Sequence, residues 1–406
     1  MPLIESRHRV LFLGLFAVFT LVGTSATIIG ATLPRILADF HWNYVTAGVV
    51  IGAGAVTYFA ATFAAGYLIG PWGPKPTIGL GLLLAGAGLA CFAATPSPVA
   101  NTLLSALMGL GQGCIEVGVN TATLRTDPRH TGRPMNLMHG AFAVGAILGP
   151  LAVSLLMRHN LGWILVYRGM AVLFALLAVM TACLALPRLA PGAAPETGAP
   201  ARRGLNAAYL LSFVALFLYV GVELGFSNWV AAYFVVAFGD SPAAGALLVS
   251  LFWTGLLAGR FGVPLLYRGA RRNAVLVGFA LLATGAIALL SLLGFLPATP
   301  LVHGLARGLV FCAGLGCSIY YPMVITLLCA CFPQSAGQAI GFAASGGGIG
   351  SFLFPFIMAA IAQRWGIRTG FATYALLAAA MVLAARGLAA RAGHQQPQGL
   401  ERPGGC

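Results

Sequence analysis

Twelve long apolar segments, joined by short loops, constrain the fold of this chain more than any other feature. Each is long enough to cross the hydrocarbon core of a bilayer, which takes about 20 apolar residues in a helix. None alternates apolar and polar residues as a barrel strand does, so we predict twelve α-helices. They lie near residues 10–34, 44–69, 76–95, 98–123, 135–157, 163–186, 207–236, 243–265, 273–296, 300–331, 337–362 and 367–387.

The composition agrees with an integral membrane protein. The chain is 59% hydrophobic and 7% charged, whereas a soluble domain carries about 25% charged residues. Its net charge of +14 comes from basic residues in short loops without interleaved aromatic residues, which argues against nucleic-acid binding. We find no nucleotide-binding motif, metal-ligand cluster or nucleophile–base pair in the sequence, so we expect no cofactor and no enzymatic activity.

The basic residues also predict the orientation in the membrane. When the chain starts in the cytoplasm, most of the 22 Lys and Arg residues fall on that side. Arg260 is counted there, whereas Arg168 and Arg307 fall within apolar segments. The positive-inside rule therefore predicts a multi-pass protein of the cell membrane with both termini in the cytoplasm. We expect it to be a monomer.

The chain divides into two related halves. Residues 187–204, "PRLAPGAAPETGAPARRG", have the composition of a flexible linker. The motif "GAILGP" at 145–150 corresponds to "GSFLFP" at 350–355, which indicates an internal repeat. We predict two pseudo-symmetric six-helix bundles with the substrate site between them at the membrane midplane. The expected units are a bundle at 1–186, a cytoplasmic linker at 187–206, a bundle at 207–390 and a flexible tail at 391–406.

Two of the 8 acidic residues lie inside predicted helices, Glu116 and Glu223, whereas the others lie in loops or tails. A charged side chain at the centre of a bilayer costs at least ~2.5 kcal/mol, so such residues usually serve a function. An apolar environment favours the neutral form of a carboxyl group, which suits proton coupling. The alternative is that each glutamate only hydrogen-bonds a neighbouring helix.

Polar residues accompany both glutamates at helical spacing. Gln112, Glu116 and Asn120 form one stripe, because residues four apart share a helix face. The second stripe contains Tyr219, Glu223 and Ser227, with Asn228 and Trp229 adjacent. With one stripe in each half, we expect the two to face each other across a central cavity and to contribute substrate-binding side chains.

Weaker candidates lie on other predicted helices. For substrate binding these are Asn136, His139, Tyr320 and Tyr321. His139 either relays protons or is hydrogen-bonded at a helix end, and the tyrosines either stack against a sugar or pack in the core. For gating they are Lys75, Arg260, Pro322, Gly346 and Gly350. Proline removes a helical amide, so Pro322 must free a backbone carbonyl. The glycines of "GGGIG" allow close helix approach or a hinge.

Three motifs resemble a known family: "GCIEVGVNTATL", "FLYVGVELGFSNWVAAYF" and "GCSIYYPMVITL" followed by "GGGIGSFLFPFIM". They are similar to the fucose/hexose-type sugar:proton symporters of the major facilitator superfamily and to their sodium-dependent glucose transporter relatives. The resemblance implies a twelve-helix major facilitator fold. It also implies that Glu116 and Asn120, at the positions of that family's span-four motif, take part in sugar recognition and proton coupling.

The sequence departs from that family at two places. Gly30 stands where the family has a second essential acid in its first span, so Glu223 is the candidate substitute. Gly70 replaces the aspartate of the usual loop signature before span three. The resemblance thus implies symport of a monosaccharide with H⁺, or with Na⁺. A drug/proton antiporter is the alternative, because "GAILGP" partly matches the antiporter motif, although Ala152 and Val153 replace its glycine pair. A non-transporting sensor or scaffold is a third hypothesis.

Overall fold

The computed structural model describes residues 9–124, 133–183, 207–266, 272–331 and 336–395. These residues form thirteen α-helices and no strand. Twelve spans are long and apolar enough to cross a membrane, because α10 and α11 together make up one of them. The helices are α1 (Arg9–Phe40), α2 (Tyr44–Trp72), α3 (Pro74–Cys91), α4 (Pro98–Leu124), α5 (Arg133–Arg158), α6 (Ile164–Cys183), α7 (Ala207–Phe238), α8 (Pro242–Leu266), α9 (Arg272–Leu293), α10 (Pro300–Cys317), α11 (Tyr320–Cys331), α12 (Ala336–Trp365) and α13 (Ile367–Gln395).

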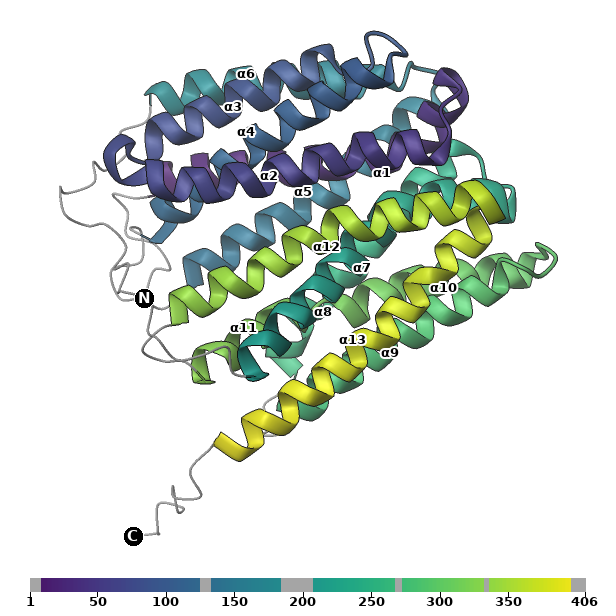
Figure 1. Ribbon diagram of the computed structural model, residues 1–406. Helices are drawn as coiled ribbons and strands as arrows, with labels where there is room; N and C mark the ends of the chain where they lie inside the picture. Colours follow the sequence, from purple (N-terminus) through teal and green to yellow (C-terminus); the bar gives the residue numbers. More distant parts are fainter. Residues whose placement is uncertain (1–8, 125–132, 184–206, 267–271, 332–335, 396–406) are drawn as a thin grey trace.

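The helices form two groups that lie side by side, α1–α6 and α7–α13 (Figure 1). Helix α1 begins and α13 ends at the same end of the molecule, which we call the termini side. The opposite end is the far side. The predicted linker 187–206 lies outside the described residues. The predicted tail at 391–406 begins too early, because α13 continues to Gln395, and the remainder lies outside the described residues.

The repeated motifs occupy equivalent positions in the two halves. A Cβ atom on Gly145 of α5 would collide with the carbonyl oxygen of Thr20 on α1. A Cβ atom on Gly350 of α12 would collide in the same way with the carbonyl of Phe217 on α7. Each glycine therefore lets its helix contact the backbone of the first helix of its own half, as small residues do in membrane proteins.

In the described residues the two halves contact each other mainly through four helix pairs, α1 with α7, α1 with α8, α5 with α8 and α2 with α12. Gly30 of α1 lies so close to α7 that its Cβ would be 2.8 Å from the Cα of Asn228. On the far side, the Tyr44 amide donates to Gln363 Oε1 at 3.0 Å. A shallow pocket of about 420 Å³ lies beside this contact, with Trp42 and Val235 among its lining residues.

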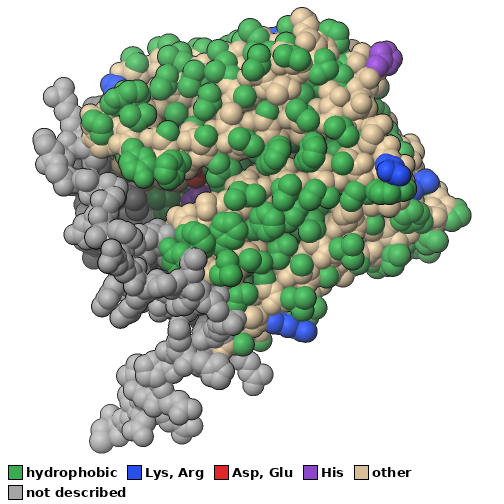
Figure 2. Space-filling view, in the orientation of Figure 1, with side chains coloured by type: hydrophobic (Ala, Val, Ile, Leu, Met, Phe, Trp, Pro, Cys, Tyr) green, Lys and Arg blue, Asp and Glu red, His purple; other side chains and the backbone are tan. Residues whose placement is uncertain are grey.

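On the termini side the halves leave a recess between them (Figure 2). Acidic and histidine side-chain atoms are visible inside it, whereas the outer surface in this view is mostly apolar. An apolar exterior is what lipid contact requires, and a polar interior at membrane depth is tolerated where it lines a water-filled cavity. The recess is therefore the part of the molecule in which a hydrophilic ligand finds polar partners.

The α1–α5 contact supplies a first prediction. We expect Gly145→Ala to lower the free energy of unfolding by about 1–3 kcal/mol, because the added methyl group has no space against the Thr20 carbonyl. Thermal unfolding in detergent measures the difference. Gly285→Ala on α9 is the matched control, since no atom lies within 4 Å of its Cβ position. Equal stability of the two variants would contradict the close α1–α5 packing.

Candidate functional site

Helix α4 carries the predicted stripe of the N-terminal half. Asn120 Nδ2 donates to Glu116 Oε1 at 2.9 Å, and Gln112 Nε2 donates to Ser25 Oγ on α1 at 3.0 Å. Gln112, Glu116 and Asn120 are all partly exposed. Among the described residues, Glu116 has no basic ion-pair partner, and the side-chain oxygen of Asn120 is buried without a hydrogen bond. This half therefore presents one unpaired carboxyl group and free hydrogen-bonding capacity.

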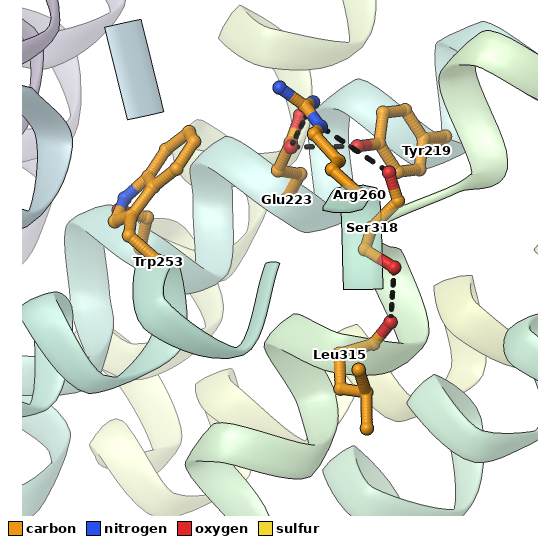
Figure 3. Close-up of polar contacts among 7 residues, drawn as sticks. Tyr219, Glu223, Trp253, Arg260, Leu315 and Ser318 are labelled. Atoms are coloured by element: carbon orange, nitrogen blue, oxygen red, sulfur yellow. Dashed lines mark hydrogen bonds and ion pairs between the residues drawn. The ribbon is translucent and has the colours of Figure 1, made fainter. Parts of the chain in front are cut away.

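Glu223, the second interior carboxyl group, lies on α7 and has a different environment from Glu116. Glu223 is 7% exposed, and its Oε1 accepts a hydrogen bond from the Tyr219 hydroxyl at 2.7 Å. The same oxygen lies 3.6 Å from Arg260 Nη2 on α8. Figure 3 shows Arg260 beside both side chains. The positive charge of Arg260 compensates the negative charge of Glu223, which a buried carboxylate requires.

Pro322 positions Arg260 through the backbone. A helical residue normally donates its amide to the carbonyl four residues earlier, which for position 322 is that of Ser318. Proline has no amide hydrogen, and α10 ends just before Ser318 while α11 begins at Tyr320. Arg260 Nε donates to the Ser318 carbonyl at 3.3 Å (Figure 3). The freed carbonyl expected from the sequence therefore exists, and Arg260 is its partner.

Two tyrosines connect the halves of the site. Tyr321 on α11 lies within electrostatic reach of Glu116, Glu223 and Arg260. Tyr58 on α2 lies within reach of both Glu116 and Tyr321. The structure thus brings the two predicted stripes to the same region, with Tyr58 near Glu116 and Tyr321 near both carboxyl groups.

His139 also faces this region. Its side chain is exposed, on a helix that packs against α1 and α8. It lies within electrostatic reach of Arg260, and its ring centroid is 5.7 Å from that of Phe19. Of Asn136, only its position in α5 is described.

Three substrate-binding candidates lie elsewhere. Tyr320 is fully buried and its hydroxyl donates to the Met381 carbonyl at 2.8 Å. Trp229 is fully buried beside Tyr44, with ring centroids 5.9 Å apart, and Asn228 is half-buried opposite Gly30. In this conformation the rings of Tyr320 and Trp229 are fully buried, Tyr320 against Tyr219 with ring centroids 5.2 Å apart, and their role in substrate binding stays a prediction.

The gating candidates predicted from the sequence also lie in different environments. Lys75 is partly exposed in the first turn of α3, and Gly346 packs against α7, where its Cβ would be 2.5 Å from the Phe213 carbonyl. A gating role for these residues and for Gly350 and Pro322 stays a prediction. The placement of Arg260 among the basic residues at the membrane surface is wrong, because it pairs with Glu223 inside the protein.

Tyr58 is not among the site residues predicted from the sequence, and Arg260 is among them only as a gating candidate. The signal for Arg260 was present, since it lies within an apolar segment and shares a helix face with Trp253, seven positions earlier. Trp253 Nε1 donates to Ser227 Oγ at 2.8 Å, so this face of α8 does contact the polar stripe of α7. The sequence offers only Thr62, four positions after Tyr58, as a polar neighbour at helical spacing, and one threonine does not distinguish Tyr58 from a packing residue.

The ion pair supplies a second prediction. We expect Glu223→Gln to lower the free energy of unfolding by about 3 kcal/mol, because it leaves the Arg260 charge uncompensated inside the protein. The double variant Glu223→Gln/Arg260→Gln removes both charges and should recover most of this loss. A double-mutant cycle measured by thermal unfolding in detergent tests the coupling. Additive effects would show that the two side chains do not interact.

A helical membrane protein whose two halves enclose a polar recess has the architecture of a secondary transporter. The family profile of the Major Facilitator Superfamily matches residues 15–313 and 242–404. The chain belongs to this superfamily, and it is a transporter rather than an enzyme. The predicted fold and the superfamily resemblance are confirmed.

Among curated proteins, the chain is 23% identical over 268 residues to the Protein TsgA homolog of Yersinia enterocolitica. This match covers 66% of each sequence. The matched region is therefore slightly less than two thirds of the length of that relative.

Solved structures share the fold over nearly the whole chain. The nucleoside transporter NupG has a TM-score of 0.76 at 14% identity and covers 93% of this chain and 98% of its own. A D-xylose-proton symporter has a TM-score of 0.72 at 15% identity, with 93% and 96% covered. The E. coli fucose:proton symporter FucP has 0.63 at 20%, with 94% and 99% covered. At these identities the likeness establishes the fold alone.

Proposed function

We propose that this transporter moves a small polar solute, of the size and polarity of a monosaccharide, together with protons. The observation that carries the proposal is Glu116, a carboxyl group at membrane depth that is partly exposed in the recess. It accepts a hydrogen bond from Asn120 but has no basic partner among the described residues. A carboxylate in such a place is costly unless it takes up a proton, so a proton is the natural coupling ion.

The side chains around Glu116 support a hydroxylated substrate. Gln112 and Asn120 offer amide donors and acceptors, and Tyr58 and Tyr321 offer rings with hydroxyl groups. Sugars combine hydroxyl groups with an apolar ring face, and both kinds of partner are present here. The structures of similar fold include proteins named for nucleoside, D-xylose and fucose transport, which agrees with a solute of this kind.

The arrangement of the halves supports alternating access. They contact each other on the far side through Tyr44 and Gln363 and leave the recess on the termini side. The excess of basic residues predicts that this side is cytoplasmic, so the conformation corresponds to an inward-facing state. Rocking of one half against the other would close the recess and open the far side, and protonation of Glu116 would remove a charge that opposes closure.

An exporter of lipophilic cations is the competing hypothesis. The Arg260–Glu223 ion pair, with 25% of the Arg260 side chain exposed, and the polar groups beside it are poor partners for a lipophilic molecule. Sodium coupling is the other alternative, and we favour the proton because Glu116, without a basic partner among the described residues, becomes neutral by taking one up. We therefore favour proton-coupled uptake.

The role of Glu116 supplies a third prediction. We expect Glu116→Gln to abolish uphill accumulation of substrate while exchange of substrate across the membrane persists, because the glutamine keeps the hydrogen bond but carries no titratable proton. A pH electrode in weakly buffered proteoliposomes should lose the substrate-induced alkalinisation. Asp39→Asn is the matched control, since Asp39 pairs with Arg35 and Trp163 away from the recess.

Retained accumulation in the Glu116→Gln variant would overturn the assignment of this residue as the proton carrier. Loss of both accumulation and exchange would show instead that Glu116 acts only in binding. The control variant should behave as the unmodified protein in both assays. A flat electrode trace in the unmodified protein with every polar solute would count against proton-coupled uptake itself.

A further inference from the structure

We propose that the transported solute carries a carboxylate, which binds Arg260 in place of Glu223. The inference rests on the proposed function above and narrows its substrate class to hydroxylated organic acids such as sugar acids. It depends on three features: the incomplete coordination of Arg260, the second partner of Glu223, and the charge balance of the recess.

The side chain of Arg260 is held in position, but not all of its N–H donors have a hydrogen-bond acceptor among the described residues. Its Nε is held by the Ser318 carbonyl at 3.3 Å, which orients the planar guanidinium group. Its Nη2 lies 3.6 Å from Glu223 Oε1, which is an ion-pair distance but too long for a hydrogen bond. The side chain is 25% exposed, so Arg260 is partly accessible, and a carboxylate binds a guanidinium group through two parallel hydrogen bonds.

Glu223 is able to release Arg260 because it has a second partner. The Tyr219 hydroxyl donates to Glu223 Oε1 at 2.7 Å, so the side chain stays anchored when the guanidinium turns to a ligand. A carboxylate left without its cation in this buried place takes up a proton. Ligand binding to Arg260 and protonation of Glu223 therefore favour each other.

The other titratable groups around Glu223 supply no competing cation. Those within its electrostatic reach are Tyr219 on α7, Arg260 on α8, Cys317 on α10 and Tyr321 on α11. Before binding, the charges of Arg260 and Glu223 cancel. After binding, the ligand carboxylate cancels Arg260 and Glu223 is neutral. The Arg260–Glu223 pair thus keeps its net charge, because Glu223 takes up one proton with each singly charged anion.

The opposite wall of the recess suits the rest of such a ligand. Gln112, Asn120 and Tyr58 lie on α4 and α2, whereas Arg260 lies on α8 of the other half. A hydroxylated acid therefore contacts both halves at once, with its carboxylate on one and its hydroxyl groups on the other. A neutral sugar lacks the group that would displace Glu223.

The experiment compares acids with matched neutral sugars. Proteoliposomes with weak buffer receive D-glucuronate or D-glucose, then D-galacturonate or D-galactose, while a pH electrode records the external medium. Each pair differs only in the oxidation of one carbon. We expect alkalinisation with the acids and little with the neutral sugars, because only a carboxylate displaces Glu223 from Arg260.

Two variants test the role of Arg260. Arg260→Lys keeps the positive charge but loses the planar guanidinium group that binds a carboxylate through two hydrogen bonds. Glu223→Gln/Arg260→Gln removes both charges and so keeps the net charge of the pair at zero. We expect each to lower the acid-induced proton uptake at least roughly tenfold, with Asp39→Asn as the control. Thermal unfolding of the double variant shows whether it remains folded.

The outcomes separate the two proposals. Alkalinisation with neutral sugars but not with acids would overturn the carboxylate inference and leave proton-coupled sugar uptake standing. Equal acid-induced signals in the unmodified protein and the folded double variant would also overturn it, since Arg260 would then not be the receptor. A flat trace with both classes of probe would count against the proposed function, and the inference would fall with it.

Discussion

The absence of water from the bilayer interior is the constraint on which the rest of this structure depends. Every polar group at that depth needs a partner within the protein. Pro322 leaves the Ser318 carbonyl without its helical donor, Arg260 supplies one, and Glu223 balances the charge that Arg260 brings. One interruption of a helix thus accounts for a chain of contacts through three helices.

The two interior carboxyl groups show how the environment separates chemically identical side chains. Glu223 is held by a cation and a tyrosine, whereas Glu116 is held by the amide of Asn120. A compensated carboxylate is stable in its charged form, and an uncompensated one changes protonation more readily. This difference in their partners underlies the roles proposed for the two glutamates.

Glycine makes the arrangement of helices possible. Gly145 and Gly350 contact equivalent first helices in the two halves, and Gly30 brings α1 against the α7 backbone one turn beyond Glu223. A Cβ atom at Gly30 would lie 2.8 Å from the backbone of α7, so an acidic side chain at this position has no room in this packing. An interior acid on the neighbouring helix is the arrangement that this packing permits.

Much of this protein followed from local sequence. The twelve spans, their division into two halves and the placement of Glu116 and Glu223 at membrane depth depend on hydropathy and spacing, which a single helix already displays. The neighbours of each side chain depended on helix rotation and packing, which only the tertiary structure decides. The pairing of Arg260 with Glu223, the approach of Tyr58 to Glu116, and the burial of Tyr320 and Trp229 away from the recess belong to that second class. A sequence position determines the helix face of a residue, but the helix that covers that face is chosen by the packing of the whole bundle.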